Sequence, residues 1–275
     1  MSIPGWEDPR RVLKRHALTP KRSFSQSFLV SRHAVERIVE ALEPDPEELT
    51  VELGPGLGTL TGELLRRGAR VLAIERDRDM LAVLDAELGH VPTLELREGD
   101  AAKVDLGAIA GGGRVALAGN LPYAITGAIL RNLVGQRSSL RRAVIMVQRE
   151  VRDRLLASPG TKAWGAPSVF VQAAFEVAPV VRVSAGSFHP PPRVESAVIR
   201  LDPRAVPVAE ETPAFRTVVK AAFGQRRKTL RNALKSLEGD AERALEQAGI
   251  DQRARGETLS IEQLATLATA WEQTL

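Results

Sequence analysis

The sequence contains no cysteine, so the protein can form neither disulfide bonds nor thiolate metal sites. It also has no run of about 18 uncharged apolar residues, the length that a membrane-spanning helix needs. The first 20 residues include Glu7 and Asp8 and lack the apolar stretch of a secretory signal. The four histidines lie too far apart to suggest a metal site: His16, His33, His90 and His189. We therefore expect a cytoplasmic protein that binds no metal and enters no membrane.

Basic and acidic residues nearly balance, with 38 Lys and Arg against 34 Asp and Glu and a net charge of +4. The basic residues are nevertheless clustered. Residues 212–235 hold seven of them and no acidic residue, residues 131–154 hold seven arginines against two acidic residues, and a third cluster lies in the first 22 residues. Most such runs are only solvated faces of helices. Three separate clusters on a nearly balanced chain favour a surface that faces a polyanion such as a nucleic acid.

The hydrophobic pattern alternates between short apolar runs and stretches of helical periodicity. It predicts strands at residues 49–53, 70–74, 94–96, 115–118 and 143–147, and helices at 34–42, 60–67, 80–88, 125–133 and 151–157. This alternation predicts an α/β fold, a Rossmann-like and mostly parallel sheet with helices on both faces. Two later predicted strands, at 169–177 and 196–201, have no helical pattern between them, so we expect them to form an antiparallel edge.

The character of the sequence changes after residue 201. Residues 202–213 contain three prolines, which is typical of a linker, and helical patterns follow at 214–237, 241–248 and 261–272. We therefore predict two domains with a boundary near residue 203. A sheet domain with a basic N-terminal entry segment covers residues 1–202, and a small helical domain covers residues 203–275.

Three glycines follow the first predicted strand of the sheet, at positions 54, 56 and 58, where the chain turns into a helix. Glycine lets the backbone turn sharply and approach a ligand closely, so this loop is a candidate cofactor site. The spacing is G-x-G-x-G, whereas the dinucleotide fingerprint G-x-G-x-x-G requires its third glycine where this chain has Thr59. The spacing therefore argues against a nicotinamide cofactor and favours a ligand without a pyrophosphate.

Polar residues lie at the ends of three further predicted strands. Glu75 ends the second strand, and its carboxylate can accept hydrogen bonds from ribose hydroxyls. Asp100 follows the third strand and can accept from an adenine amino group, and Asn120 follows the fourth. Each could singly be an ordinary solvated side chain at the end of a strand. Because parallel strands end at one edge of a sheet, these residues and the glycine loop together predict a site for a nucleoside-type cofactor.

The most informative short motif is Asn120, Leu121, Pro122 and Tyr123. The asparagine oxygen can accept from an amino group, the proline stiffens the backbone so that nearby carbonyls can be aimed, and the tyrosine offers a flat face on which a base can stack. These are the groups needed to hold an exocyclic amine still during methyl transfer. The alternative is a simple turn, in which asparagine and proline are common and the other two residues only pack.

With these residues placed, the chain resembles the rRNA adenine N6-dimethyltransferase family along nearly its whole length, from about residue 14 to residue 270. The resemblance is carried by the entry segment, the cofactor loop, the end of the second strand, the tetrapeptide and three longer stretches: residues 21–29, 52–61, 73–77, 120–123, 146–151, 187–196 and 222–230. Its bacterial ribosomal type dimethylates two adjacent adenosines in a hairpin near the 3′ end of small-subunit (16S) rRNA. The resemblance implies this activity, S-adenosylmethionine as cofactor, the small ribosomal subunit as partner and a role in its biogenesis.

The resemblance also implies roles for individual residues. Asn120, Leu121, Pro122 and Tyr123 would be catalytic, and Tyr123 and Phe188 would sandwich the target adenine. Phe188 lies in a polar, proline-rich loop, where we expect little burial. Nothing in the sequence demands more than a monomer. Contacts to S-adenosylmethionine would come from Ser27, Leu29, Gly54, Gly56, Glu75, Asp100 and Asn120. The RNA backbone would be held by Arg226, Arg227, Lys228 and Arg231.

One departure from the family pattern lies in the entry segment. The family usually reads Gly-Gln-Asn-Phe-Leu, where this chain has serine at positions 25 and 27. If residue 27 contacts the cofactor through its backbone, nothing is lost, whereas a contact through the asparagine side chain would make cofactor affinity fall. Ser25 also restricts the backbone where glycine is usual. We therefore expect either weaker cofactor binding or an entry loop that becomes ordered only on the ribosome.

Two alternative functions are open at this point. One is a large-subunit (23S) rRNA adenine methyltransferase that confers antibiotic resistance, which shares the cofactor site and an Asn-x-Pro-Tyr motif. Leu121 and the stretches 189–196 and 226–232 favour the small-subunit enzyme. The other alternative is a catalytically weak RNA-binding assembly factor, which the serines at 25 and 27 suggest. The intact tetrapeptide, Glu75 and Asp100 argue against it.

Overall fold

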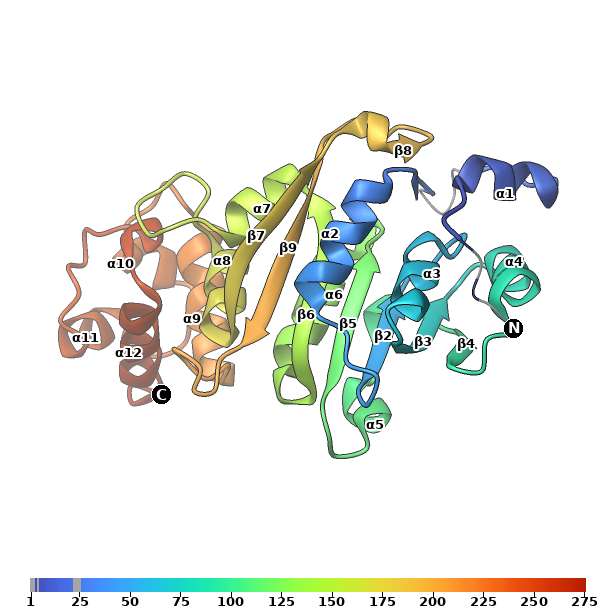
Figure 1. The fold of residues 1–275 in the computed structure, drawn as a ribbon. Helices are drawn as coiled ribbons and strands as arrows, with labels where there is room; N and C mark the ends of the chain where they lie inside the picture. Colours follow the sequence, from blue (N-terminus) through green and yellow to red (C-terminus); the bar gives the residue numbers. More distant parts are fainter. Residues whose placement is uncertain (1–2, 4, 22–25) are drawn as a thin grey trace. The chain divides into compact units, whose positions relative to one another are not determined.

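The computed structural model describes residue 3, residues 5–21 and residues 26–275 (Figure 1). Ser25 lies outside the described residues. Backbone contacts divide the chain into two compact units. The first contains residues 1–152 and 176–203, and the second contains residues 153–175 and 204–275. Residues 153–175 therefore belong to the helical unit, whereas the predicted boundary near residue 203 places them in the sheet domain.

The first unit is built around a seven-stranded sheet with the order β4-β3-β2-β5-β6-β9-β7. Its parallel strands are β2 (Leu49–Leu53), β3 (Arg70–Glu75), β4 (Leu94–Glu98), β5 (Val115–Asn120) and β6 (Leu140–Gln148). Strand β9 (Ser196–Pro203) runs antiparallel to β6, and β7 (Phe175–Val183) lies beside it at the edge. Figure 1 shows β7 and β9 running in opposite directions. The prediction of a mostly parallel α/β sheet with an antiparallel edge is confirmed.

Helices α2 (Arg32–Leu42) and α3 (Thr59–Arg66) bury their apolar residues in one core cluster with the sheet, which Leu84 and Leu88 of α4 (Arg78–Leu88) also join. Alternate strand residues enter this cluster, for example Val71 and Ala73 of β3, because successive side chains of a strand point to opposite faces. Ser31 caps the start of α2 and Asp77 caps the start of α4, and the side chain of each accepts from a backbone N–H group of the first turn. Helices α5 (Leu106–Ala110) and α6 (Thr126–Gly135) follow β4 and β5.

The strand order places the predicted site residues together. From β2 the chain adds β3 and β4 on one side of the sheet, and it then places β5 on the other side of β2. The order in which strands are added therefore reverses between β2 and β5. In open α/β sheets the ligand crevice forms outside the carboxyl ends of the strands at such a switch point. The glycine loop, Glu75, Asp100 and Asn120 follow or end the four strands β2, β3, β4 and β5.

Two of the predicted elements are wrong. Residues 169–174 of the predicted strand belong to helix α8 (Ala166–Ala174), and strand β7 begins only at Phe175. A short apolar run alone does not distinguish a buried helix from a strand. Pro167 in the first turn and the hydroxyl of Ser168, which accepts from Gly165 N (3.1 Å), were the available helix signals. The predicted helix 214–237 is two helices, α9 (Pro213–Gly224) and α10 (Leu230–Leu234). The break follows Gly224, a poor helix former, and Leu230 N bonds to Ala254 O (2.8 Å).

The second unit has a core of its own, formed by α8, α9, α10, α11 (Ala241–Gln247) and α12 (Ile261–Glu272). Trp164 is buried there, and its indole N–H donates to Leu259 O (3.1 Å). Phe170 and Phe215 meet edge to face with their ring centroids 6.0 Å apart. Helix α7 (Arg149–Leu155) directly follows β6. Within the described residues, no helix is both long and apolar enough to cross a bilayer.

The N-terminal segment contains an element that we did not predict, helix α1 (Pro9–Arg15). Its signals are local: Asp8 caps it through a bond from Arg10 N (2.9 Å), and Pro9 occupies the first turn. Strand β1 (Phe28–Leu29) then pairs antiparallel with β8 (Phe188–His189). The register joins Leu29 to Phe188 and so brings the entry segment to the proline-rich loop.

Candidate active site

The glycine loop between β2 and α3 has a left-handed backbone at its glycines. Gly54 has φ +69° and Gly56 has φ +56°, conformations that residues with a side chain rarely adopt. The N–H of Gly54 donates to Ile74 O at 3.0 Å, which ties the loop to the neighbouring strand. The loop therefore presents bare backbone at the end of β2.

The Glu75 carboxylate holds this loop in place from the end of β3. It accepts from the N–H groups of Gly56 (3.1 Å), Arg76 (2.8 Å) and Asp77 (2.9 Å). A carboxylate has about four acceptor positions, so one remains for a hydroxyl donor of a ligand. Asp100 is ordered in a similar way, because its Oδ1 accepts from Ala102 N at 3.0 Å.

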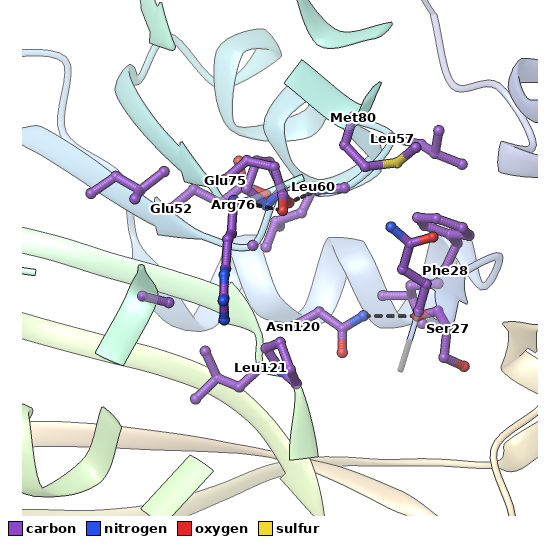
Figure 2. A pocket seen from close by; sticks show the side chains of 18 of the residues that line it. Ser27, Phe28, Glu52, Leu57, Leu60, Glu75, Arg76, Met80, Asn120 and Leu121 are labelled. Carbon is purple, nitrogen blue, oxygen red and sulfur yellow. Dashed lines mark hydrogen bonds between the residues drawn. The ribbon is translucent and has the colours of Figure 1, made fainter. Parts of the chain in front are cut away.

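These residues line a cavity of about 240 Å³ (Figure 2). The structure brings together in its wall every residue for which we predict a cofactor or catalytic role: Ser27, Leu29, Gly54, Gly56, Glu75, Asp100, Asn120, Leu121, Pro122, Tyr123 and Phe188. Apolar side chains that include Leu57 and Met80 complete it. One cavity therefore combines an ordered polar set with an apolar wall, as small-molecule sites usually do.

Asn120 is the last residue of β5 and lies in the middle of the site. Its Nδ2 donates to the backbone carbonyl of Ser27 at 3.3 Å, as Figure 2 shows. The hydroxyl of Tyr123 and Ser196 Oγ lie 2.5 Å apart, which fixes the half-buried phenol. Burial raises the pKa of Tyr123 above its usual value of 10.0, and the Ser196 bond offsets part of the shift. The phenol is therefore neutral at physiological pH.

Phe188 differs from the expectation of an accessible loop residue. It is only 4% exposed and belongs to the main core cluster, although it also lines the cavity. The expectation of little burial is wrong because β8 pairs with β1, a contact across 159 positions that joins Leu29 to Phe188. Its predicted place beside the target adenine remains a prediction.

Glu52 is a cavity residue whose importance we did not predict. It is 1% exposed, and its Oε2 has no hydrogen-bond partner in the described part of the chain. Burial, assisted by the negative charge of Glu75, raises its pKa to about 8, so the carboxyl is largely protonated at neutral pH. The available signal was a lone charged residue inside the apolar run 49–53.

The four basic residues predicted to bind RNA lie in the second unit and differ in their surroundings. Arg226 pairs with Glu257 (3.0 Å) and donates to Lys162 O (2.8 Å), and Arg231 pairs with Glu242 (2.6 Å). Arg227 and Lys228 are exposed, and no carboxylate among the described residues pairs with them. Among those residues, no group of three or more histidine or acidic side chains is arranged to hold a metal ion.

Comparison with known proteins identifies the family. A family model described as ribosomal RNA adenine dimethylase matches residues 17–273. This chain belongs to that family. The ribosomal RNA small subunit methyltransferase A of Myxococcus xanthus is 46% identical over 273 residues, which cover 96% of this chain and 95% of that protein. The resemblance deduced from the motifs is confirmed, and so is the predicted class of enzyme, an rRNA adenine dimethyltransferase.

Solved structures agree with the fold. A dimethyladenosine transferase from Plasmodium falciparum superposes with a TM-score of 0.77 at 23% identity, over 90% of this chain and 98% of that one. The 23S rRNA methyltransferase ErmE superposes with a TM-score of 0.68 at 28% identity, over 90% of this chain and all of that one. Because a methyltransferase named for 23S rRNA also has this fold, the fold alone does not select the small subunit as the substrate.

Proposed function

We propose that this protein transfers methyl groups from S-adenosylmethionine to N6 of two adjacent adenosines near the 3′ end of small-subunit rRNA, in the bacterial cytoplasm. The observation that carries the proposal is the convergence of the glycine loop, Glu75, Asp100 and Asn120 on one cavity. The name of the Myxococcus xanthus relative supports the small subunit as the substrate.

The residues of the cavity fit the cofactor. The bare backbone at Gly54 and Gly56 leaves room for close approach, Glu75 would accept from one ribose hydroxyl at its remaining acceptor position, and Asp100 would accept from the adenine amino group. The unpartnered Oε2 of Glu52 offers one further buried hydrogen-bonding position. When bound, S-adenosylmethionine supplies an electrophilic methyl group on its sulfonium. The apolar wall formed by Leu57 and Met80 would exclude water from its surroundings.

The tetrapeptide would hold the target amine with two acceptors. The first is Asn120 Oδ1. The carbonyl of Pro122 already accepts from Ile125 N (3.1 Å) and Thr126 Oγ1 (3.3 Å), which occupies both of its lone pairs. The carbonyl of Leu121 is therefore the better candidate for the second acceptor. Two such bonds favour a more tetrahedral nitrogen, whose lone pair is then free to attack, and this positioning lowers the barrier.

Tyr123 would contribute by stacking and not by proton transfer. Its hydroxyl is held by Ser196, so the ring has a fixed plane against which adenine can rest. The raised pKa keeps the phenol protonated at physiological pH, so it has no phenolate to act as a base. No dedicated base is required, because the methylated ammonium is acidic enough to lose its proton to water. The target base must leave any stack, which costs little in a loop.

The decisive test is methyl transfer from labelled S-adenosylmethionine to unmethylated small subunits, with large-subunit RNA in parallel and digestion of the products to nucleosides. We expect dimethyladenosine from the small subunit only, and none with Asn120→Ala. Thr266→Ala serves as the control, because it removes an exposed hydroxyl of α12 that bonds to Glu262 O (3.0 Å) far along the chain from the tetrapeptide. Label only in large-subunit RNA would contradict the proposed substrate. Absence of S-adenosylmethionine binding together with tight RNA binding would indicate an assembly factor.

The proposed RNA contact has its own test. Replacing Arg227 and Lys228 together by alanine should weaken small-subunit binding and reduce its dependence on salt, because phosphate contacts release counterions. The same change should leave S-adenosylmethionine affinity unaltered, since neither residue lines the cavity. An unchanged salt dependence would show that these cations do not face phosphates.

A further inference from the structure

The hydrogen bond between Asn120 and Ser27 determines which end of the asparagine side chain faces the substrate. The oxygen and nitrogen of a carboxamide have nearly the same shape, so geometry alone does not orient the group. The backbone carbonyl of Ser27 can only accept, so the NH2 of Asn120 must face it. Figure 2 shows the Asn120 oxygen turned away from Ser27. Only this orientation presents an acceptor to an adenine amino group.

The carbonyl of Ser27 is itself held in place from two sides. On one side, the Ser27 hydroxyl donates to Pro190 O at 2.7 Å. The residues that follow Ser27 are joined to the same loop by the β1–β8 pairing and by a bond from Val30 N to Ser187 O (2.8 Å). On the other side, Gln26 Nε2 donates to Asp77 Oδ2 at 2.7 Å. Rotation of the residue 27 backbone would therefore disrupt several bonds at once.

We infer that Ser27 is a positioning residue: its backbone carbonyl orients the Asn120 carboxamide, and its hydroxyl fixes that carbonyl against the loop that carries Phe188. The inference rests on the proposed function for its kinetic consequence and on geometry for the contact itself. It also gives the serine a use at a position where the family usually has asparagine. The hydroxyl is the group that links the Asn120 side of the cavity to the Phe188 side.

The hydrogen bond between Asn120 and Ser27 can be observed by NMR without an activity assay, because the chain has only three asparagines: Asn120, Asn132 and Asn232. Labelling asparagine side chains with 15N gives three NH2 pairs, and Asn120→Ala assigns one of them. Asn132 Nδ2 donates to Val104 O (2.8 Å) and is an internal standard for a bonded carboxamide, whereas Asn232 is exposed. In the wild type the Asn120 pair should resemble that of Asn132. In Ser27→Ala it should move toward that of Asn232, with Asn132 unmoved, and Ser27→Thr should restore it.

The kinetic arm separates positioning from cofactor binding. Losing one hydroxyl bond should lower kcat of Ser27→Ala on the order of fivefold at saturating S-adenosylmethionine. The dissociation constant of the cofactor should change less than about twofold, because any backbone contact of residue 27 survives in alanine. Ser27→Thr should recover kcat, and Thr266→Ala should not alter it.

Three outcomes would overturn the inference: an unmoved Asn120 signal in Ser27→Ala, an unchanged kcat, or a loss confined to cofactor affinity, which would make Ser27 a cofactor contact. A wild-type protein that transfers no methyl group would contradict the proposed function. In that case the Asn120 signal would still decide whether Ser27 orients the carboxamide, so the two failures are distinguishable.

Discussion

Replacing Glu52 by glutamine should make the protein more stable relative to the wild type as the pH rises. Glu52 is 1% exposed, and burial raises its pKa from 4.5 to about 8. In the unfolded chain the carboxyl loses its proton near its ordinary pKa, whereas the folded protein retains the proton until the pH approaches 8. Between these values the folded state binds the extra proton, so stability is fully present below pH 4.5 and is lost as the pH rises to about 8.

The size of the effect follows from the same shift. Each pKa unit corresponds to about 1.4 kcal/mol, so the change from 4.5 to about 8 corresponds to a loss of about 5 kcal/mol. Glutamine has nearly the same shape and does not titrate, so Glu52→Gln should lack this loss. The free energy of unfolding should be measured with urea from about pH 5 to about pH 9. The difference between the two proteins should grow until the pH reaches about 8 and then stay constant.

Glu47→Gln is the matched control, because Glu47 is exposed two residues before β2. Its stability curve should stay parallel to that of the wild type throughout. A difference between Glu52→Gln and the wild type that does not vary with pH would refute the reasoning, because it would mean that Glu52 is already charged in the folded protein.

Three further predictions concern neighbouring parts of the site. Tyr123 is the only tyrosine, so ultraviolet titration should show one phenol transition, with a midpoint above pH 10.0. Ser196→Ala should raise that midpoint further, because it removes the bond that lowers the pKa of Tyr123. A midpoint at or below pH 10.0 would contradict the burial of the phenol. Gly58→Ala should lower the free energy of unfolding by about 1–2 kcal/mol more than Gly112→Ala. Both glycines have a left-handed φ, but only a Cβ at Gly58 would lie 2.8 Å from a leucine methyl, and equal losses would rule out the clash. Glu75→Gln should weaken S-adenosylmethionine binding about tenfold by calorimetry, since an amide cannot accept all three N–H bonds; unchanged affinity would exclude Glu75 from the ribose site.

The sequence predicts the sheet and the placement of its polar strand ends well, because both depend on local patterns. Strand periodicity locates β2, β3 and β5, and the rule that parallel strands end at one edge brings Glu75 and Asn120 together without any knowledge of contacts. The features that were missed depend on long-range packing. The burial of Phe188 requires β8 to find β1, and the protonation of Glu52 requires the surrounding helices to exclude water. Neither is visible in the residues that flank them.

The spacing of the strand ends shows how local and long-range features meet in the site. Strands β2 and β5 pair in register, with Leu53 opposite Gly119, one residue before the glycine loop and one before Asn120. A Cβ at Gly119 would lie 2.7 Å from Leu53 O, so only glycine permits this approach. Gly119 is therefore a condition for bringing the glycine loop and Asn120 side by side. A motif search that begins at Asn120 omits the residue that lets β5 reach the site, which is why the tetrapeptide indicates the proposed chemistry but not the assembly of the site.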